Sequence, residues 1–457
     1  MIKRTVVLLV AVGLCLSIAQ GDITPNGDVD PADPASWKTT TDAYIGKIGE
    51  GSVSVDSGSD LFSQFGYLGY ETGSLGSVMI RGAGTTWTNF AWTSLLDPSY
   101  LYVGYEGDGA LEITDGGSVT YTASYVGYEA GSHGAVTVSG AGSTWTNSWL
   151  IPSATTDLYV GYEGDGALEI ADAGVVSNTS GYIGYESGSG GAVTVSGAGS
   201  TWTNSEGLCI GRYGNGTLTI ADGGLVEVVG DTYTAKYADS AGVVNFDNGT
   251  LTTGGFLGVV SGTGTINTKG LVIDADLLFD TNHGLTQTAT LDGPGRNIKV
   301  NLDVDGSRSM GVGYGGNGSM QILDGLTVPS TSGYLGYQFG STGVVTVSGA
   351  ESAWIHNDLY VGYGGDGRLE ITSGAAVMSK RSYIGYETGS TGVVTVDQTG
   401  STWYSSDSVH IGQYGDGVVS ITDSGAVTNR KDSRIGHYSG SSGVVTVSGS
   451  GASWTGV

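Results

Sequence analysis

The chain has 457 residues, of which 83 are glycine and only 13% are charged, with 17 Lys and Arg against 44 Asp and Glu. The formal charge of −27 repels phosphate backbones and excludes nucleic acid as a partner. Glycine follows no Gly-X-Y period, which excludes collagen, and the Ser, Thr, Val and Tyr around it favour β-structure.

The N-terminal segment 1–21 has the features of a secretory signal peptide. Lys3 and Arg4 precede an apolar run at 5–19, and small residues near its end offer cleavage points. We therefore expect 1–21 to be removed when the protein is exported to the extracellular space or to the cell surface, where it could associate with the outer membrane. An uncleaved membrane anchor is the alternative. Residues 22–43 are expected to form a linker or a cap, and no later segment is apolar enough to span a bilayer.

Internal repeats dominate residues 44–230 and 310–457. The stretch "LYVGYEGDGALEI" at 101–113 recurs unchanged at 158–170, and "VTVSGAGSTWTN" also occurs twice. These two types of unit alternate, so that a pair spans about 50 residues. Each unit holds short stretches of alternating apolar and polar residues that are separated by glycine.

The alternation predicts strands with one apolar face. Val136 and Val138 share one side of such a strand, and Thr137 lies on the other. One unit cannot bury this face alone, but stacking on similar neighbours does so, and corner glycines supply the positive φ of tight turns. The pattern predicts an all-β fold, a parallel β-solenoid of about sixteen coils. A β-propeller is the alternative, because a period near 50 matches some blades.

Residues 231–309 lose the motif and are expected to form degenerate coils. The interval from Trp202 to Trp354 is close to three pairs of units, so the phase is kept. Most acids of the chain recur in phase, but those in this section do not. Asp274 and Asp276, which share strand parity, are therefore the best candidates for paired catalytic carboxylates.

The units "LYVGYEGDGALEITDGGSV" and "GYIGYESGSGGAVTVSGAGSTWTN" resemble the repeat associated with type V secretion (autotransporter) and PEP-CTERM-sorted bacterial proteins. The stretch "GTGTINTKGLVIDADLLFDT" at 262–281 resembles autotransporter-associated β-strand segments. Together these resemblances cover most of the chain. They imply a secreted or surface-exposed passenger of β-helical form, without established catalytic residues.

Aromatic residues recur at fixed positions of the repeat. A residue that is present in every period favours packing over ligand contact, so we predict aromatic ladders, and the pattern leaves open whether the tyrosines face inward or outward. Cys209 takes the place of Tyr102 and Tyr159 and is interpreted as a repeat variant rather than a nucleophile. The recurring tryptophans are Trp87, Trp145, Trp202, Trp354, Trp403 and Trp454.

Acidic residues follow the recurring tyrosines. If the coils stack in register, Glu106 and Glu129 come within about 5 Å, where a hard cation such as Ca²⁺ would relieve their repulsion. The alternative is a solvated glycine turn without any cofactor. The candidate metal ligands are Glu106, Asp108, Glu129, Glu163, Asp165 and Glu186.

Two insertions follow the tryptophan in consecutive pairs of units, "FAWTSLLDPSY" at 90–100 and "SWLIPSATTD" at 148–157. In a solenoid they emerge on the same side, and insertions on one face of a repeat array often form the binding surface. The alternative is that they fold down over a gap. The candidate binding residues are Trp92, Leu95, Leu96, Trp149, Leu150 and Ile151.

The sequence thus predicts an exported, acidic repeat protein with a structural or adhesive role and without catalytic activity. Its expected partners are extracellular polysaccharides or surface proteins. One alternative is a β-helix carbohydrate-active enzyme, either a polysaccharide lyase or a glycoside hydrolase. Another is an extracellular spacer that is stiffened by calcium.

Overall fold

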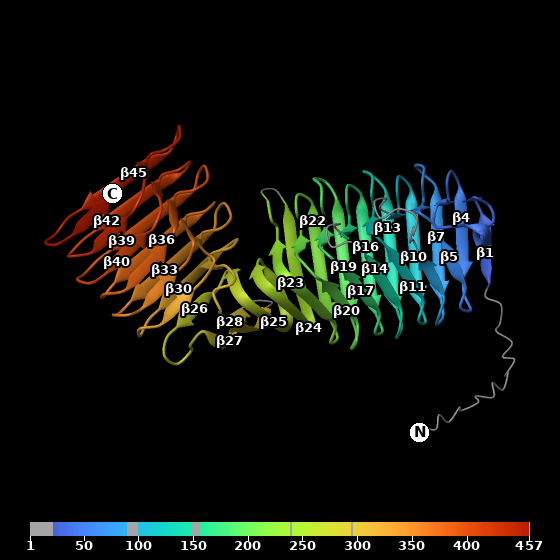
Figure 1. Cartoon of the computed structure of the whole chain (residues 1–457), viewed down its shortest axis with the longest axis horizontal. Coiled ribbons are helices and arrows are strands. Elements are labelled where there is room, and N and C mark those ends of the chain that lie inside the picture. Colours follow the sequence, from blue (N-terminus) through green and yellow to red (C-terminus); the bar gives the residue numbers. More distant parts are fainter. Residues whose placement is uncertain (1–21, 89–98, 148–155, 238–239, 294–295, 457) are drawn as a thin grey trace, which may run out of the picture.

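The computed structural model describes residues 22–88, 99–147, 156–237, 240–293 and 296–456 (Figure 1). Strands make up 59% of it and helix 1%, and they wind into a parallel β-solenoid of about sixteen turns. This confirms the predicted fold over the propeller. The rod bends near its middle, between the green and the orange coils (Figure 1).

Each regular coil contributes three strands, and each strand pairs in parallel with its counterparts in the coils before and after. The first face of the rod contains β3 (Asp42–Ile45), β6 (Phe65–Leu68), β9 (Tyr100–Val103), β12 (Ala123–Val126), β15 (Leu158–Val160), β18 (Gly181–Ile183), β21 (Leu208–Ile210), β29 (Met310–Val312), β32 (Ser332–Leu335), β35 (Asp358–Val361), β38 (Arg381–Ile384), β41 (Val409–Ile411) and β44 (Ser433–Ile435). The second face contains β4 (Glu50–Val55), β7 (Leu75–Arg81), β10 (Asp108–Thr114), β13 (His133–Ser139), β16 (Asp165–Ala171), β19 (Gly190–Ser196), β22 (Asn215–Ala221), β26 (Asp276–Phe279), β30 (Asn317–Ile322), β33 (Thr342–Ser348), β36 (Asp366–Thr372), β39 (Thr391–Val396), β42 (Asp416–Ile421) and β45 (Ser442–Val447). The third face contains β5 (Asp60–Phe62), β8 (Thr86–Thr88), β11 (Ser118–Tyr121), β14 (Thr144–Asn147), β17 (Val175–Asn178), β20 (Thr201–Asn204), β28 (Arg296–Asp303), β31 (Thr327–Pro329), β34 (Ala353–Ile355), β37 (Ala376–Ser379), β40 (Thr402–Ser405), β43 (Ala426–Asn429) and β46 (Ser453–Gly456).

Alternation within the strands builds the core. In β13, Val136 and Val138 are buried, while Thr137 between them faces outward. Leu168 and Ile170 of β16 pair with the two valines, so apolar side chains stack from coil to coil along the inside of the rod. Because every coil buries its apolar face against two neighbours, strands this short are stable only within the stack.

The recurring tryptophans belong to this core. Five of them are fully buried on the third face, and the Nε1–H of Trp202 donates to Asn178 Oδ1 of the preceding coil at 2.7 Å. The prediction that these rings pack inside rather than bind a ligand is confirmed. The five are Trp87, Trp145, Trp202, Trp354 and Trp403.

Residues 22–43 cover the first coil. In this segment β1 (Ile23–Gly27) pairs antiparallel with β4, and β2 (Val29–Asp30) pairs antiparallel with β3. A 3-10 turn, η1 (Pro34–Ser36), precedes Trp37, which is only 4% exposed and donates from Nε1 to Pro31 O at 2.9 Å. The segment therefore acts as a cap on the solenoid.

The bend arises from coils of unequal length. Three long strands, β23 (Leu225–Thr234), β24 (Ala241–Leu257) and β25 (Val260–Ile273), cross the corner between two faces. Leu257 pairs with Val272, which follows it so closely in the chain that this coil lacks a corner loop. Val272 then pairs with Gly311, much further along the chain, because the next coil contains β26, β28 and the added strand β27 (Thr286–Gly293).

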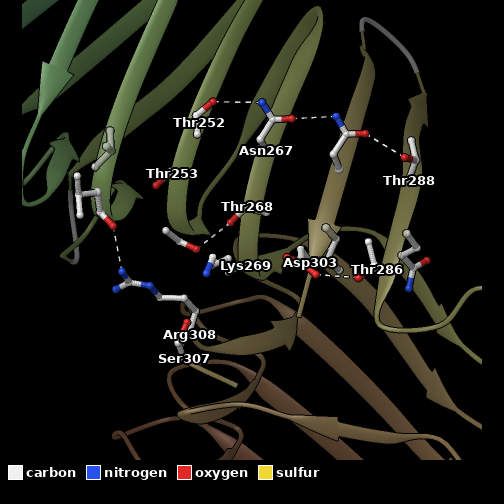
Figure 2. A pocket seen from close by; sticks show the side chains of 16 residues that line it. Thr252, Thr253, Asn267, Thr268, Lys269, Thr286, Thr288, Asp303, Ser307 and Arg308 are labelled. Atoms are coloured by element: carbon white, nitrogen blue, oxygen red, sulfur yellow. Dashed lines mark hydrogen bonds between the residues drawn. The ribbon is translucent and has the colours of Figure 1, made fainter. Parts of the chain in front are cut away.

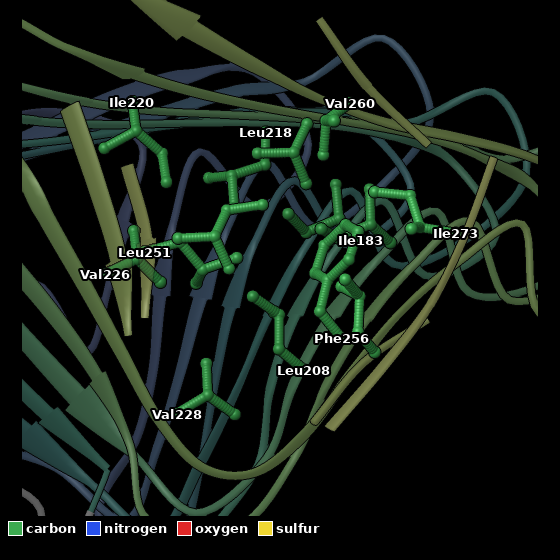
Figure 3. Packing of buried hydrophobic residues seen from close by; sticks show 14 of the residues in the cluster. Ile183, Leu208, Leu218, Ile220, Val226, Val228, Leu251, Phe256, Val260 and Ile273 are labelled. Carbon is green, nitrogen blue, oxygen red and sulfur yellow. The ribbon is translucent and has the colours of Figure 1, made fainter. Parts of the chain in front are cut away.

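The short coil brings its neighbours together on one side of the rod. The Tyr314 hydroxyl donates to Thr234 O, and Gln338 Nε2 donates to Ala235 O at 2.6 Å, across the missing corner. Across the bend, only the first face continues, whereas the second restarts at β26 and the third at β31 among the described residues. Figure 3 shows the apolar core continuing up to this point, where it contains Leu208, Phe256 and Ile273.

Two corner glycines that both have positive φ angles test how closely the coils approach one another. A Cβ on Gly127 (φ +70°) would lie 2.2 Å from Asp165 O, whereas a Cβ on Gly131 (φ +87°) meets nothing within 4 Å. We expect Gly131→Ala to lower the free energy of unfolding by about 1 kcal/mol, the cost of a left-handed alanine. Gly127→Ala should lower it considerably more, as measured by urea denaturation. Equal losses would contradict the close approach.

Candidate binding surface

The features that do not repeat gather at one corner of the coils, which we call the variable edge. It is the corner between the third face of one coil and the first face of the next. Both predicted insertions belong to it, because one lies between β8 and β9 and the other between β14 and β15. The six candidate binding residues Trp92, Leu95, Leu96, Trp149, Leu150 and Ile151 lie outside the described residues, so their role stays a prediction.

Buried polar groups hold the bases of the two insertions. Ser99 Oγ lies 2.9 Å from Thr122 Oγ1 of the intervening coil. Asn147 Nδ2 donates to Asp157 O at 2.9 Å, and Ser124 Oγ donates to Asn147 Oδ1 at 2.8 Å. These bonds connect three successive coils, so they fix the chain where it leaves the first insertion and where it enters and leaves the second.

The tyrosines form two parallel ladders on the outside of the rod. In the first ladder, the rings of Tyr102 and Tyr125 stack with centroids 5.2 Å apart, and in the second the rings of Tyr105 and Tyr128 do the same. Rings of the two ladders meet edge to face, as Tyr102 and Tyr128 do at 4.8 Å. Burial raises the pKa of Tyr102, so its phenol stays neutral. The predicted ladders are thus present, and they face outward.

Cys209 interrupts the first tyrosine ladder. It pairs with Tyr182 of the preceding coil and Tyr233 of the next, as expected of a repeat variant. Its side chain is buried, and this burial raises the pKa of the thiol to about 11. A protonated, buried thiol is a poor nucleophile, which supports the sequence interpretation.

The candidate calcium ligands are not gathered into one site. His133 lies between two of them, with Nδ1 3.2 Å from Asp108 Oδ1 and Nε2 3.8 Å from Asp165 Oδ2. An imidazole therefore occupies the place where a cation would be held by these carboxylates. Across the described part of the chain, no group of three or more His, Cys, Asp or Glu side chains could hold a metal ion.

The candidate catalytic carboxylates bond to the following coil, Asp274 at a turn and Asp276 between two paired strands. Asp274 accepts hydrogen bonds from the Gly315 N–H at 3.1 and 3.3 Å, and Asp276 Oδ1 accepts one from Ser319 Oγ at 2.5 Å. Both partners belong to the coil after the bend. The two carboxylates therefore fix the start of the second half of the rod, and neither lines the cavities described next.

Two adjoining cavities open on the variable edge at the bend. The smaller, about 430 Å³, is lined by Tyr182, Cys209 and Tyr233, and the larger, about 740 Å³, is lined by residues of β24, β25, β27 and β28. Val229 and Arg308 line both cavities. We call the two together the bend groove, of which Figure 2 shows the larger cavity.

A row of hydrogen-bonded side chains crosses the larger cavity. Asn267 Nδ2 donates to Thr252 Oγ1 at 3.1 Å, Asn301 Nδ2 donates to Asn267 Oδ1 at 2.8 Å, and Thr288 Oγ1 donates to Asn301 Oδ1 at 2.9 Å. Figure 2 shows this row above Arg308. Each of the four residues lies on a different strand, so the row runs across the sheet, perpendicular to the strands.

Ion pairs flank this row. Lys269 Nζ lies 2.8 Å from Asp305 Oδ2, and this contact lowers the pKa of Asp305. Arg308 contacts Asp231 at 3.2 Å and donates to Val229 O at 3.0 Å, at the boundary that the two cavities share.

Sequence reasoning missed the bend groove, although one signal for it was present. Between positions 82 and 367, every Lys and Arg lies in the segment 212–308. Within those limits, the regular coils on either side carry none. This concentration of cations marks the bend as different from the rest of an acidic rod. The cations of the segment are Arg212, Lys236, Lys269, Arg296, Lys299 and Arg308.

Comparisons of the chain with models of protein families, with curated proteins and with solved structures find no match. Among the described residues, none of the helical structure is long and apolar enough to cross a membrane.

The stacked carboxylates give a pH-dependent prediction. Burial raises the pKa of Glu129, and Glu163 and Glu106 in the adjacent coils raise it further. A raised folded pKa stabilises the fold below the unfolded value, and this contribution is lost as pH rises through the folded value. At pH 7 the Glu129→Gln variant should therefore be more stable by a few tenths of a kcal/mol. The gain should vanish below about pH 4 in urea titrations.

Glu112→Gln is the matched control for that measurement. Glu112 is exposed on β10 and has Met79 and Thr137 as its neighbours in adjacent coils. The Glu112→Gln variant should show no pH-dependent gain in its free energy of unfolding. A gain of the same size in both variants would contradict repulsion within the stack.

Calcium is expected to leave the rod unchanged. Because His133 separates Asp108 from Asp165, we expect the same thermal midpoint with millimolar Ca²⁺ and with excess chelator. Thermal unfolding followed by circular dichroism measures this. A rise of several degrees with Ca²⁺ that the chelator reverses would restore the calcium-stiffened spacer.

Proposed function

We propose that the protein is an exported, non-catalytic structural module of the cell surface or the extracellular space, and that its variable edge binds a polysaccharide or a surface protein. The observation that carries this proposal is the separation of two kinds of residue. Inward residues repeat in register from coil to coil, whereas both insertion bases and the bend groove lie on one edge.

The sequence supports the same interpretation. Its N-terminal segment 1–21 has the pattern of a signal peptide, and its repeats resemble those of secreted passenger proteins. A charge of −27 keeps such a rod soluble and separate from other copies of itself. A long, narrow scaffold of this kind holds its binding edge away from whatever carries it.

The carbohydrate-active enzyme is the less favoured alternative. A glycosidase needs two carboxyl groups in different environments on either side of the scissile bond. Asp274 and Asp276 instead accept hydrogen bonds from the following coil, Asp274 from a turn and Asp276 from the paired strand.

Replacing both insertions tests the proposal. Residues 90–98 and 149–155 would each be exchanged for the chain's own short corner, Ser205–Gly207, which joins β20 to β21. Because the core does not depend on corner length, the thermal midpoint should stay within a few degrees. Adhesion to cells should be lost.

Phe339→Ser provides the control for the adhesion assay. Phe339 is 85% exposed, but it lies at the corner between the first and second faces, away from the variable edge. Its removal should leave adhesion unchanged. Full adhesion by the chain without insertions would refute their binding role.

A further inference from the structure

The interruption at Cys209 leaves a slot in the first tyrosine ladder. Along the regular ladder each ring lies against the next, as Tyr159 and Tyr182 do at 4.9 Å. Tyr182 and Tyr233 are two coils apart, with the Cys209 side chain at the position between them. Two coil spacings amount to about 10 Å, which leaves the thickness of one ring between the two tyrosines.

A cavity occupies this slot. The smaller part of the bend groove, about 430 Å³, is lined by Tyr182 and Tyr233 together with Cys209 and Leu208. Both tyrosines are half-buried, while Cys209 is only 5% exposed, so the thiol lies at the floor and the rings form the walls. A ligand ring that enters the slot would stack on an aromatic ring at each of its two faces, an arrangement that favours flat ligands with apolar faces.

The rim of the slot carries charged groups of both signs. Glu206, Asp231 and Lys236 all line the cavity, and Lys236 Nζ lies 4.7 Å from the centre of the Tyr233 ring. A ring with apolar faces and a hydroxylated circumference matches such walls and such a rim. A sugar ring has this form, because its C–H groups line its faces and its hydroxyls point sideways.

The slot continues into the row of polar side chains. Val229 and Arg308 belong to both cavities, so a ligand can extend from one into the other. Asn301 uses one amide hydrogen for Asn267 and keeps a second, and Thr252 accepts from Asn267 while its own hydroxyl hydrogen remains available. A chain of hydroxylated rings that crosses the strands can form hydrogen bonds with successive side chains of this row.

From these contacts we infer that the bend groove binds an extended carbohydrate chain, with one sugar ring held between Tyr182 and Tyr233 above Cys209. This inference deepens the proposed function, on which it rests, because it names the class of partner and the residues that hold it.

Filling the slot tests the inference. In Cys209→Tyr the new ring completes the ladder and takes the place of the sugar, so the fold is kept while binding is lost. Native affinity electrophoresis in gels that contain dextran, xylan, mannan, pectin or alginate measures binding. We expect the unaltered protein to be retarded by at least one of these. For that polysaccharide, Cys209→Tyr should lose tenfold or more in affinity and melt at or above the original temperature.

His410→Tyr is the matched control. It adds a tyrosine to the same face, where His410 already stacks on Tyr383 at 5.1 Å, but it lies far from the groove. Its binding should equal that of the unaltered protein. Asn301→Ala, which removes a member of the polar row from an intact slot, should weaken binding about tenfold and serves if Cys209→Tyr does not fold.

Two results would overturn the inference: retardation by none of the five polysaccharides, or undiminished binding by both Cys209→Tyr and Asn301→Ala. The failure of the groove is distinguishable from the failure of the proposed function. If both groove variants keep full binding to polysaccharide while the chain without insertions loses adhesion to cells, the groove is refuted and the adhesive role stands. If the unaltered protein adheres to nothing, the adhesive role itself is refuted.

Discussion

Parallel strands lie about 4.8 Å apart, so a side chain in a regular coil lies beside its counterpart from the next coil. The stability of the structure depends on which residues can stack on a similar residue in the next coil. Val136 on Leu168 and Tyr102 on Tyr125 gain from it, because apolar and aromatic surfaces are covered. Carboxylates do not gain: burial raises the pKa of Glu129, and the neighbouring Glu163 and Glu106 raise it further. For the same reason, His133 between Asp108 and Asp165 is better accommodated than a third acid.

Much of the fold could be predicted because the chain repeats itself. The recurrence of Trp145 and Trp202 shows which strands stack, and the alternation around Thr137 shows which side is buried. The direction of the tyrosines could not be predicted in this way. Tyr125 and Val126 are neighbours on one strand and both have apolar surface, so composition alone does not say which of them lies inside.

The bend groove was beyond sequence reasoning for a different reason. It depends on the pairing of Leu257 with Val272, which makes one coil short and the next long, and neither partner carries a motif. In regular coils the side chains pack against and hydrogen-bond to those of adjacent coils. A cavity with free polar and aromatic groups therefore forms where this regular pairing is interrupted. Cys209 and the added strand β27 both mark such places. The insertions share the same edge but lie outside the described residues, and their contribution stays a prediction.

The unequal coils also decide how the rod responds to a pulling force. Within each straight arm, three ladders of strands share a load applied along the axis. At the bend a single ladder passes from one arm to the other, through the pairing of β25 with β29 at Leu271, Val272 and Ile273. We expect tension between the two ends to concentrate on the few hydrogen bonds of this ladder and on the side-chain contacts beside it.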